Sequence, residues 1–369
     1  MTSPTFVCHH AERSGGELAL ADLLPELADR TPRVLVGADG PMVDVWSAAG
    51  ASVTVVPHSH RSGLRESGPA LALLDGAKLV DWGRRLRASS RGELLIANSL
   101  PAGLALAATH PRPSGIWAIH DHVSSDYLGP AAVRSSTWAL RRWRGPLVAN
   151  SSSTQALLPP QSHSVVIPPA TAPLSMRAGA VGSDSPLVVA VLGRLAPWKG
   201  QHVAIDAFAD AFGGGPEQLL VIGGPVFGEV DYERELKSQI EARGIGLQVR
   251  MIGHVDDPSA ALRDAHVLVH SSVLPEPFGR VLVEGLSAGL SVVATDSPAT
   301  REILDQGRFG LLVSPGSVSE LAAALTNLSD GVMITRFSAA GPERAGLYAP
   351  ARVGPSWHRL LDDTSEAAQ

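Results

Sequence analysis

Short apolar runs alternate with longer amphipathic segments along most of the chain. In the first half, six apolar runs have the length of buried strands: Thr5–Cys8, Arg33–Gly37, Ser52–Val56, Leu94–Asn98, Gly115–His120 and Leu147–Asn150. Helical stretches, of which Glu17–Asp29 is the first, lie between most of these runs. The alternation predicts a parallel sheet wrapped by helices.

A second series of the same kind follows a stretch rich in Pro, Ala, Gly and Ser at residues 168–186, which we interpret as an interdomain linker. The expected strands are Leu187–Leu192, Gln218–Ile222, Val249–Ile252, His266–His270 and Ser291–Thr295. The expected helices are His202–Phe212, Tyr232–Arg243 and Ser259–Asp264. With 369 residues, the chain has room for two such α/β domains.

Composition indicates a globular protein, with 44% hydrophobic and 18% charged residues and a mean hydropathy of +0.11. No apolar run approaches the roughly 18 residues of a membrane span, and Met1–Pro4 lacks the pattern of a signal peptide. We therefore expect a cytoplasmic protein. The single cysteine, Cys8, cannot form an internal disulfide or a zinc site, and we expect it to be a small buried side chain.

The formal charge of −6 is unevenly distributed along the chain. Residues 1–172 carry a net charge of +2 and the remainder carries −8, which argues against general nucleic-acid binding. Two segments are locally basic: Arg134–Arg144, which contains two tryptophans, and the cluster Arg84, Arg85, Arg87 and Arg91. We interpret both as solvated helix surfaces. Weak attraction to anionic lipid, at most a peripheral membrane contact, or to an anionic acceptor is the alternative.

Polar residues follow several strands of the first series. They are Asn98-Ser99, His120-Asp121-His122 and Asn150-Ser151-Ser152. Ligands of parallel sheets collect at the carboxyl ends of strands, so His120 is a candidate for a polar substrate contact. A structural histidine is the alternative. A metal site is disfavoured, because only His120 and His122 share a face of the strand and no third ligand is nearby.

The pair Gly15-Gly16 lies where the first strand passes into a helix. Paired glycines at this position let the backbone approach a phosphate and direct its N–H groups toward it. The same pair also occurs in ordinary loops, and the dinucleotide fingerprint G-x-G-x-x-G is absent.

The loop after the first strand of the second series, Gly193–Gln201, carries two cations, Arg194 and Lys199. Arginine binds phosphate oxygens in pairs and lysine acts as a mobile point charge, so together they could neutralise a diphosphate. Mg²⁺ often does this, but the chain lacks a clear carboxylate cluster for it. We therefore predict a site without a metal.

The stretch Glu276–Glu302 reads as a polar loop, a helix that ends at a glycine, and a buried strand. Glu276 and Glu284 are separated by about 12 Å along an ideal helix axis at roughly 1.5 Å per residue. Carboxylates that act on one glycosidic bond lie about 5 to 9.5 Å apart. The spacing instead fits two acids that hold opposite ends of one extended ligand. The helix N-terminus beside Phe278 and Gly279 would present free N–H groups to it.

Together these motifs resemble the retaining glycosyltransferases of the GT-B fold, in the large family 4 group. The most specific motifs are Gly193-Arg194 through Lys199-Gly200, Glu276-Pro277-Phe278-Gly279, and Glu284. Weaker similarity covers Gly15–Glu17, Ala149–Thr154, Val166–Pro168 and Phe309–Val313. The resemblance implies two Rossmann-like parallel-sheet domains that face a central cleft. Residues 1–172 would form the acceptor side, 173–345 would bind the nucleotide sugar, and the helix at Val353–Leu361 within the tail 346–369 would return to the first domain.

The resemblance also implies a role for individual residues. Catalytic roles fall to Arg194, Lys199, Glu276 and His120. Donor-binding roles fall to Gly15, Gly16, Gly193, Ile252, Gly253, Pro277, Phe278, Gly279, Arg280 and Glu284. Arg194 and Lys199 would stabilise the leaving diphosphate, and His120 would lie beside the transferred sugar. Glu276 would hold sugar hydroxyls, Glu284 the ribose, and Ile252-Gly253 would border the base.

Enzymes of this kind transfer a sugar from a nucleotide-diphosphate donor to a small-molecule or lipid-linked acceptor hydroxyl, with retention and without a metal or other cofactor. Bacterial members build envelope glycoconjugates or decorate secondary metabolites. Two alternatives remain: a sugar-nucleotide-binding protein that has lost catalysis, and a sugar-nucleotide epimerase of the same fold. No cation or motif carboxylate is missing, so activity is expected.

Overall fold

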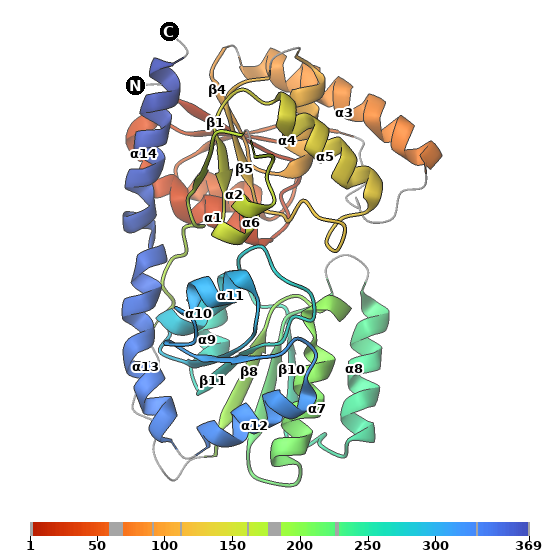
Figure 1. The fold of residues 1–369 in the computed structure, drawn as a ribbon, viewed down its shortest axis with the longest axis vertical. Helices are drawn as coiled ribbons and strands as arrows, with labels where there is room; N and C mark the ends of the chain where they lie inside the picture. The colour runs from red at the N-terminus through yellow and green to blue at the C-terminus, as the bar shows by residue number, and fades with distance from the viewer. Residues whose placement is uncertain are drawn as a thin grey trace. The chain divides into compact units, whose positions relative to one another are not determined.

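The computed structural model describes residues 3–58, 69–90, 92–110, 113–160, 162–175, 186–225, 229–329 and 331–367. The chain forms two compact units (Figure 1). Unit 1 comprises Met1–Thr171 and Tyr348–Gln369, and unit 2 comprises Ala172–Leu347. Residues 176–185 of the predicted linker lie outside the described residues.

Unit 1 is built on a seven-stranded parallel sheet with the order β3-β2-β1-β4-β5-β6-β7. The strands are β1 (Pro4–Cys8), β2 (Arg33–Val36), β3 (Ser52–Val55), β4 (Leu94–Ala97), β5 (Ile116–Ile119), β6 (Leu147–Ala149) and β7 (Ser164–Val166). Six were predicted to within one or two residues. The seventh, Ser164–Val166, was not predicted as a strand, because three residues give too short an alternation to recognise.

Successive residues of these strands alternate between two cores, as the pleat requires. Val7, Leu35 and Trp117 face a core formed with α3 (Pro69–Ser90), α4 (Leu100–Ala108) and α5 (Pro130–Arg142). Phe6, Cys8 and Val34 face the other core, which α1 (Gly15–Leu23), η1 (Leu24–Arg30) and α2 (Met42–Ala48) cover. The short helix α6 (Ser152–Ala156) follows β6. Cys8 is fully buried, as expected.

The predicted helix Glu17–Asp29 is divided in the structure. The α-helix α1 starts two residues earlier, at Gly15, and ends at Leu23, and a 3₁₀ helix continues to Arg30. Pro25 accounts for the change, because it has no N–H to donate to the carbonyl four residues before it.

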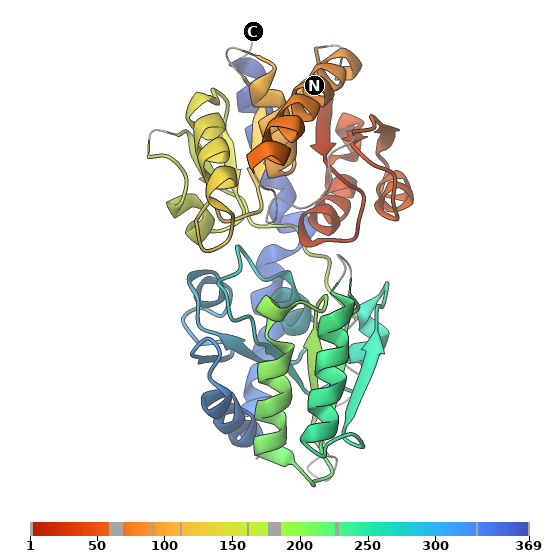
Figure 2. The ribbon, with the colours of Figure 1, turned by 90° about the vertical axis from the view of Figure 1, so that its right-hand side faces the viewer.

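Unit 2 contains a six-stranded sheet with the order β10-β9-β8-β11-β12-β13, and every pair of neighbouring strands is parallel. The strands are β8 (Val188–Leu192), β9 (Gln218–Ile222), β10 (Val249–Gly253), β11 (Val267–His270), β12 (Ser291–Thr295) and β13 (Leu311–Val313). The helices are η2 (Pro197–Lys199), α7 (Gln201–Phe212), α8 (Val230–Ala242), α9 (Pro258–Leu262), α10 (Arg280–Ser287), α11 (Pro298–Ile303), α12 (Val318–Leu328) and α13 (Val332–Ala345). Figure 2 shows α7 and α8 side by side on one face of this sheet.

The last helix, α14 (Pro350–Glu366), follows the short η3 (Gly346–Tyr348) and belongs to unit 1. Its buried face includes Val353 and Trp357, and the Trp357 ring lies edge-on to Phe6 of β1 at 6.0 Å between centroids. Arg30 of η1 donates to both carboxylate oxygens of Asp362 at 2.9 and 3.0 Å. The structure thus places the C-terminal helix against the core of unit 1.

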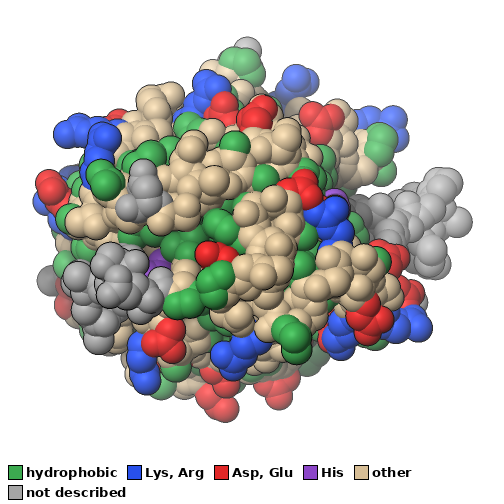
Figure 3. Space-filling model, turned by 90° about the horizontal axis from the view of Figure 1, so that it is seen from below, with side chains coloured by type: hydrophobic (Ala, Val, Ile, Leu, Met, Phe, Trp, Pro, Cys, Tyr) green, Lys and Arg blue, Asp and Glu red, His purple; other side chains and the backbone are tan. Residues whose placement is uncertain are grey.

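The surface shows no preference for one sign of charge on the face drawn in Figure 3, where acidic and basic side chains are interspersed. Within the described part of the chain, no helix combines the length and the hydropathy that a membrane crossing requires.

Candidate functional site

The loop that follows β8 is held in one conformation by its glycines and by bonds to the segment after β11. Gly200 has a φ of 68°, and a Cβ atom there would collide with the Ser271 carbonyl oxygen, so glycine is required. The Trp198 carbonyl accepts from the Val273 N–H at 2.9 Å. The Ser271 hydroxyl donates to the Lys199 carbonyl at 3.0 Å. These contacts hold Lys199 beside the carboxyl end of β11.

Glu276 is the centre of a buried polar cluster in unit 2. Its Oε1 atom accepts from Lys199 Nζ at 2.6 Å and contacts His270 Nε2 at 2.8 Å. The Ser272 hydroxyl donates to the same oxygen. The other oxygen, Oε2, has no hydrogen-bond partner among the described residues, and a cavity of about 10 Å³ adjoins the side chain. The carboxylate is therefore fixed in place with one oxygen available to accept from a hydroxyl.

The charge state of Glu276 follows from opposing effects. Burial raises the pKa of this carboxyl, but the Lys199 ammonium and His270 beside it bring the pKa well below its usual range. The side chains of Glu276 and Lys199 are only 8% and 17% exposed, so solvent screens their attraction weakly. Glu276 is ionised at neutral pH.

Arg194 lies on the same loop as Lys199. Its guanidinium donates to Glu229 at 2.5 Å, and its carbonyl accepts from Gln201 Nε2 at 2.9 Å. The Trp198 ring contacts both cations, with Arg194 Cζ 5.4 Å and Lys199 Nζ 4.5 Å from its centroid. Cation–π contacts of this kind help to hold the two side chains in place. Each cation of the loop is thus paired with a carboxylate of unit 2.

The N-terminus of α10 lies next in the sequence after Glu276. Gly279 is the N-cap with a φ of 106°, which favours glycine, and no side chain caps the helix. The first turn therefore presents backbone N–H groups and the positive end of the helix dipole. Glu284 is buried on this helix and accepts from Arg280 Nε at 2.7 Å. Because α10 starts at Arg280, the 12 Å estimate, which treated the segment from Glu276 as helical, does not apply to its first four residues.

The remaining predicted donor-binding residues lie at strand ends of the same sheet. Gly193 follows β8, and Ile252-Gly253 ends β10, with a φ of 81° at Gly253. The Gly223 N–H donates to the Gly253 carbonyl at 2.8 Å. The structure therefore brings Lys199 and Glu276 into direct contact, pairs Arg280 with Glu284, and places Ile252-Gly253 at the carboxyl end of a strand of the same sheet.

In unit 1, the predicted residues Gly15 and Gly16 are the first two residues of α1. A Cβ atom on Gly16 would lie 3.2 Å from Cδ2 of His120, whereas one on Gly15 would meet nothing within 4 Å. Gly16 therefore has a packing role, since it lets the helix approach the imidazole. The predicted phosphate contact of both glycines remains a prediction.

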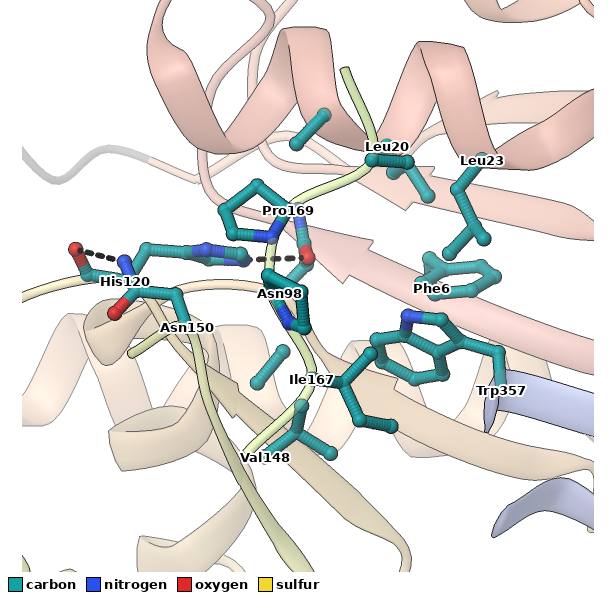
Figure 4. A pocket seen from close by; sticks show the side chains of 14 residues that line it. Phe6, Leu20, Leu23, Asn98, His120, Val148, Asn150, Ile167, Pro169 and Trp357 are labelled. Carbon is teal, nitrogen blue, oxygen red and sulfur yellow. Dashed lines mark hydrogen bonds between the residues drawn. The ribbon is translucent and has the colours of Figure 1, made fainter. Parts of the chain in front are cut away.

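His120 lies at the edge of a small cavity of about 20 Å³ (Figure 4). Its Nε2 atom is 3.0 Å from Asn98 Oδ1, and its carbonyl accepts from Asn150 Nδ2 at 3.3 Å. The other lining residues are mostly apolar and include Phe6 and Trp357. Burial lowers the pKa of His120 to about 4, so the imidazole is neutral at pH 7.

Asn150 also lines this cavity and is 5% exposed. Its Oδ1 atom is buried and has no hydrogen-bond partner in the described part of the chain. A cavity of this size can hold a water molecule, which would satisfy that oxygen.

Several side chains that contact the predicted site residues were not singled out from the sequence. His270 was expected only as the last residue of a strand, although a polar residue at the carboxyl end of a buried strand is itself a signal. Glu229 had no signal, because 35 residues separate it from its partner Arg194. Asn98 and Asn150 were noted at strand ends without a role.

Potential metal ligands occur together at one place in the described residues. Ligand atoms of His9, His10 and Glu17 all lie within 4.8 Å of one another. Local hydrogen bonds already engage this loop: the Glu12 N–H donates to His10 Nδ1 at 3.3 Å, and the Ser14 hydroxyl bonds to Glu17. His122 contacts the Ser153 hydroxyl at 3.3 Å, so the two histidines of the predicted strand end have different partners.

Comparison with known proteins gives the family. Residues 177–342 match the family model described as glycosyl transferases group 1. A phosphatidyl-myo-inositol mannosyltransferase of Mycobacterium leprae is 34% identical over 260 residues, which cover 59% of this chain and 67% of the relative. The corresponding protein of Mycobacterium tuberculosis is 31% identical over 280 residues, which cover 63% and 72%.

The fold also has solved counterparts. The crystal structure of Anabaena Alr3699/HepE in complex with UDP and glucose matches with a TM-score of 0.83 and 23% identity, covering 98% of this chain and all of that one. A sucrose-phosphate synthase from Thermosynechococcus elongatus matches with a TM-score of 0.78 and 16% identity, covering 99% of this chain and all of that one. The chain has the GT-B fold and belongs to the group 1 glycosyltransferases.

Proposed function

We propose that this glycosyltransferase moves a sugar from a nucleotide-diphosphate donor to an acceptor hydroxyl with retention of the anomeric configuration, as in family 4. The observation that carries the proposal is the ion pair between Lys199 and the buried, ionised Glu276, beside Arg194 and the uncapped N-terminus of α10. The carboxylate can accept from sugar hydroxyls while the cations receive a diphosphate.

The diphosphate would be bound by exchange of ion pairs. In this structure Arg194 is paired with Glu229, and Lys199 is paired with Glu276. A bound diphosphate would replace Glu229 on Arg194 and share Lys199 with Glu276. When the bond from the anomeric carbon to the diphosphate oxygen breaks, the electron pair stays on that oxygen. The fixed cations and helix dipole then stabilise the charge without reorganisation.

Retention would follow from attack on the face that the diphosphate leaves. The acceptor oxygen forms the new bond to the anomeric carbon through a short-lived oxocarbenium-like pair, and its proton passes to the departing phosphate oxygen. Arg194 and Lys199 supply the positive charge that Mg²⁺ supplies elsewhere, so we propose that the reaction needs no metal. The neutral His120 would lie beside the transferred sugar.

The comparisons support a nucleotide-sugar donor and a lipid-linked or polyol acceptor, but they do not identify the individual substrates. The Anabaena protein of the same fold was crystallised with UDP and glucose, which supports a nucleotide-sugar donor. The mycobacterial relatives are named for mannosyl transfer to phosphatidyl-myo-inositol, which supports a lipid-linked or polyol acceptor. A lipid-linked acceptor would fit a cytoplasmic enzyme with at most peripheral membrane contact. The 48% exposed Trp138 on the arginine-rich helix α5 would suit such a contact.

A thermal-shift screen against nucleoside diphosphates and their sugars tests the proposal, because a ligand that binds only the folded state raises the Tm. We expect one base to raise the Tm, and the matching sugar nucleotide to release free diphosphate when acceptors are added. Stabilisation without turnover across a broad acceptor panel would indicate a binding protein instead. Release of an epimerised sugar without any acceptor would indicate an epimerase.

A further inference from the structure

We propose that Asn98 is a positioning residue, which holds His120 as the neutral Nε2–H tautomer so that Nδ1 accepts a hydrogen bond from a substrate hydroxyl. The inference rests on the proposed function, which places His120 beside the transferred sugar. Figure 4 shows the Asn98 amide against the His120 ring, with Asn150 holding the backbone of the same residue.

The tautomer follows from the hydrogen-bond inventory. Asn98 Nδ2 donates to Cys8 Sγ at 3.6 Å, so the amide oxygen is the atom that faces the imidazole. An amide oxygen can only accept, and therefore the Nε2 atom of His120, 3.0 Å away, carries the proton. A neutral imidazole has one N–H group, which leaves Nδ1 as an acceptor.

The ring cannot easily rotate to exchange its two nitrogens. Gly16 lies against the Cγ–Cδ2–Nε2 side of the ring, where an added Cβ would be 3.2 Å from Cδ2 and 3.6 Å from Nε2. Asn150 holds the His120 carbonyl at 3.3 Å, which fixes the backbone from which the ring extends. Nδ1 has no hydrogen-bond partner among the described residues, and His120 is partly exposed. Its lone pair is therefore available to a ligand.

The surroundings keep this acceptor uncharged. Titratable groups occur on the neighbouring elements, among them Cys8 of β1, Glu17 of α1, and Asp121 and His122 of the loop after β5. The lining residues Asn150 of the β6 end and Trp357 of α14 are neutral. Burial, and none of these groups, lowers the pKa of His120 to about 4. Protonation would place a proton on Nδ1 and turn the acceptor into a donor. With a pKa of about 4, the His120 imidazole stays neutral and Nδ1 stays an acceptor above about pH 5.

Asn98→Asp tests the inference, because a carboxylate still accepts from Nε2 but favours the imidazolium form. We expect release of nucleoside diphosphate from the sugar donor identified by thermal shift to fall about tenfold below wild type at pH 6, and to stay within about threefold of wild type at pH 8.5. Asn98→Leu, which removes the acceptor, should lower the rate by a similar factor at all pH values while the Tm shift by nucleoside diphosphate is kept. Asn327→Asp on the exposed face of α12 is the matched control.

A direct readout uses ¹⁵N NMR of the histidine-labelled full chain, which reports the protonated nitrogen without an acceptor or a donor. Wild-type protein should show the Nε2–H pattern for His120 down to about pH 5, and Asn98→Leu should show a mixture of tautomers. A wild-type Nδ1–H pattern, or an Asn98→Asp pH profile parallel to that of wild type, would overturn the inference. Failure of every sugar nucleotide to bind would instead count against the proposed function, and the spectra would still decide the tautomer.

Discussion

The two polar sites of this protein use opposite electrostatics at equivalent places, the carboxyl ends of parallel strands. In unit 2, Lys199, Arg194 and Arg280 are each paired with a carboxylate. In unit 1, His120 is neutral and hydrogen-bonded to an amide. Under the proposed function, the site in unit 2 receives a charged diphosphate with charges that exchange partners, whereas the site in unit 1 offers a hydroxyl a fixed neutral acceptor.

Loss of a cation in unit 2 should have the largest effect. Lys199→Ala removes the ammonium proposed to stabilise the leaving diphosphate, and we expect kcat to fall about 10²- to 10³-fold, the range seen when one preorganised electrostatic group is lost. Steady-state kinetics with the donor found by thermal shift measures this.

The control for that substitution is Lys237→Ala, which breaks an exposed pair with Glu233 on α8 and should leave kcat unchanged. Lys199→Ala also leaves Glu276 buried with fewer partners, so part of the loss could reflect unfolding. The double variant Lys199→Ala/Glu276→Gln should regain thermal stability without regaining turnover. An unchanged rate in a folded Lys199→Ala protein would contradict the diphosphate assignment.

The charge of Glu276 should also show in stability against pH. Its pKa in the folded protein lies well below the unfolded value of about 4.3, so its ionisation stabilises the fold above that pH, and the contribution is lost as pH falls through the folded pKa. Glu276→Gln should therefore lower the free energy of unfolding at pH 7 by on the order of 3 kcal/mol. The difference from wild type should narrow between about pH 5 and pH 3.

Denaturant titrations at several pH values measure that difference. Glu233→Gln, which removes a carboxylate from an exposed pair, should show almost no pH-dependent difference from wild type. A constant gap between wild type and Glu276→Gln from pH 7 to pH 3 would mean that Glu276 is not held ionised in the fold.

The sequence specified the fold more completely than the site. Most strand positions were predictable because the inner strands of both sheets are buried on two faces and are nearly continuous apolar runs, unlike the partly exposed edge strands β3, β7 and β10. Lys199 and Glu276 were found because each lies in a compact motif beside glycines. Glu229 and His270 were not found. Glu229 contacts Arg194, which lies 35 positions away in the sequence, and His270 contacts Glu276, which lies six positions away. No local pattern encodes such pairings. Likewise, the short strand β7 and the 3₁₀ continuation of α1 depend on tertiary packing and on one proline.

Removal of Glu229, the carboxylate paired with Arg194, should have a smaller effect than loss of Lys199 and should strengthen the binding of nucleoside diphosphate. Glu229→Gln removes the carboxylate that is proposed to compete with a diphosphate for Arg194. The pair is partly exposed, with side chains 28% and 19% accessible. Partly exposed pairs are worth about 0.2–1 kcal/mol, so we expect nucleoside-diphosphate affinity to rise about two- to fivefold. Isothermal titration calorimetry at fixed salt measures it, with Glu241→Gln on α8 as the control. Weaker binding would show that Glu229 helps to orient Arg194 and does not compete for it.

Removal of metal ions should have the smallest effect on the transfer rate. It tests whether the side-chain charges of unit 2 can support the reaction without a metal. Dialysis against EDTA should leave the transfer rate within about twofold of the untreated enzyme, because Arg194 and Lys199 are proposed to stabilise the developing charge directly. His9, His10 and Glu17 near the start of α1 could bind an added ion, so the effect of added Zn²⁺ is measured as well. Added Zn²⁺ should therefore not raise the rate, and the variant Glu17→Gln should respond to EDTA and Zn²⁺ as wild type does. Loss of activity in EDTA with recovery on Mg²⁺ or Mn²⁺ would mean that the two cations do not suffice. In that case the positive charge of the site in unit 2 would come in part from a bound metal ion.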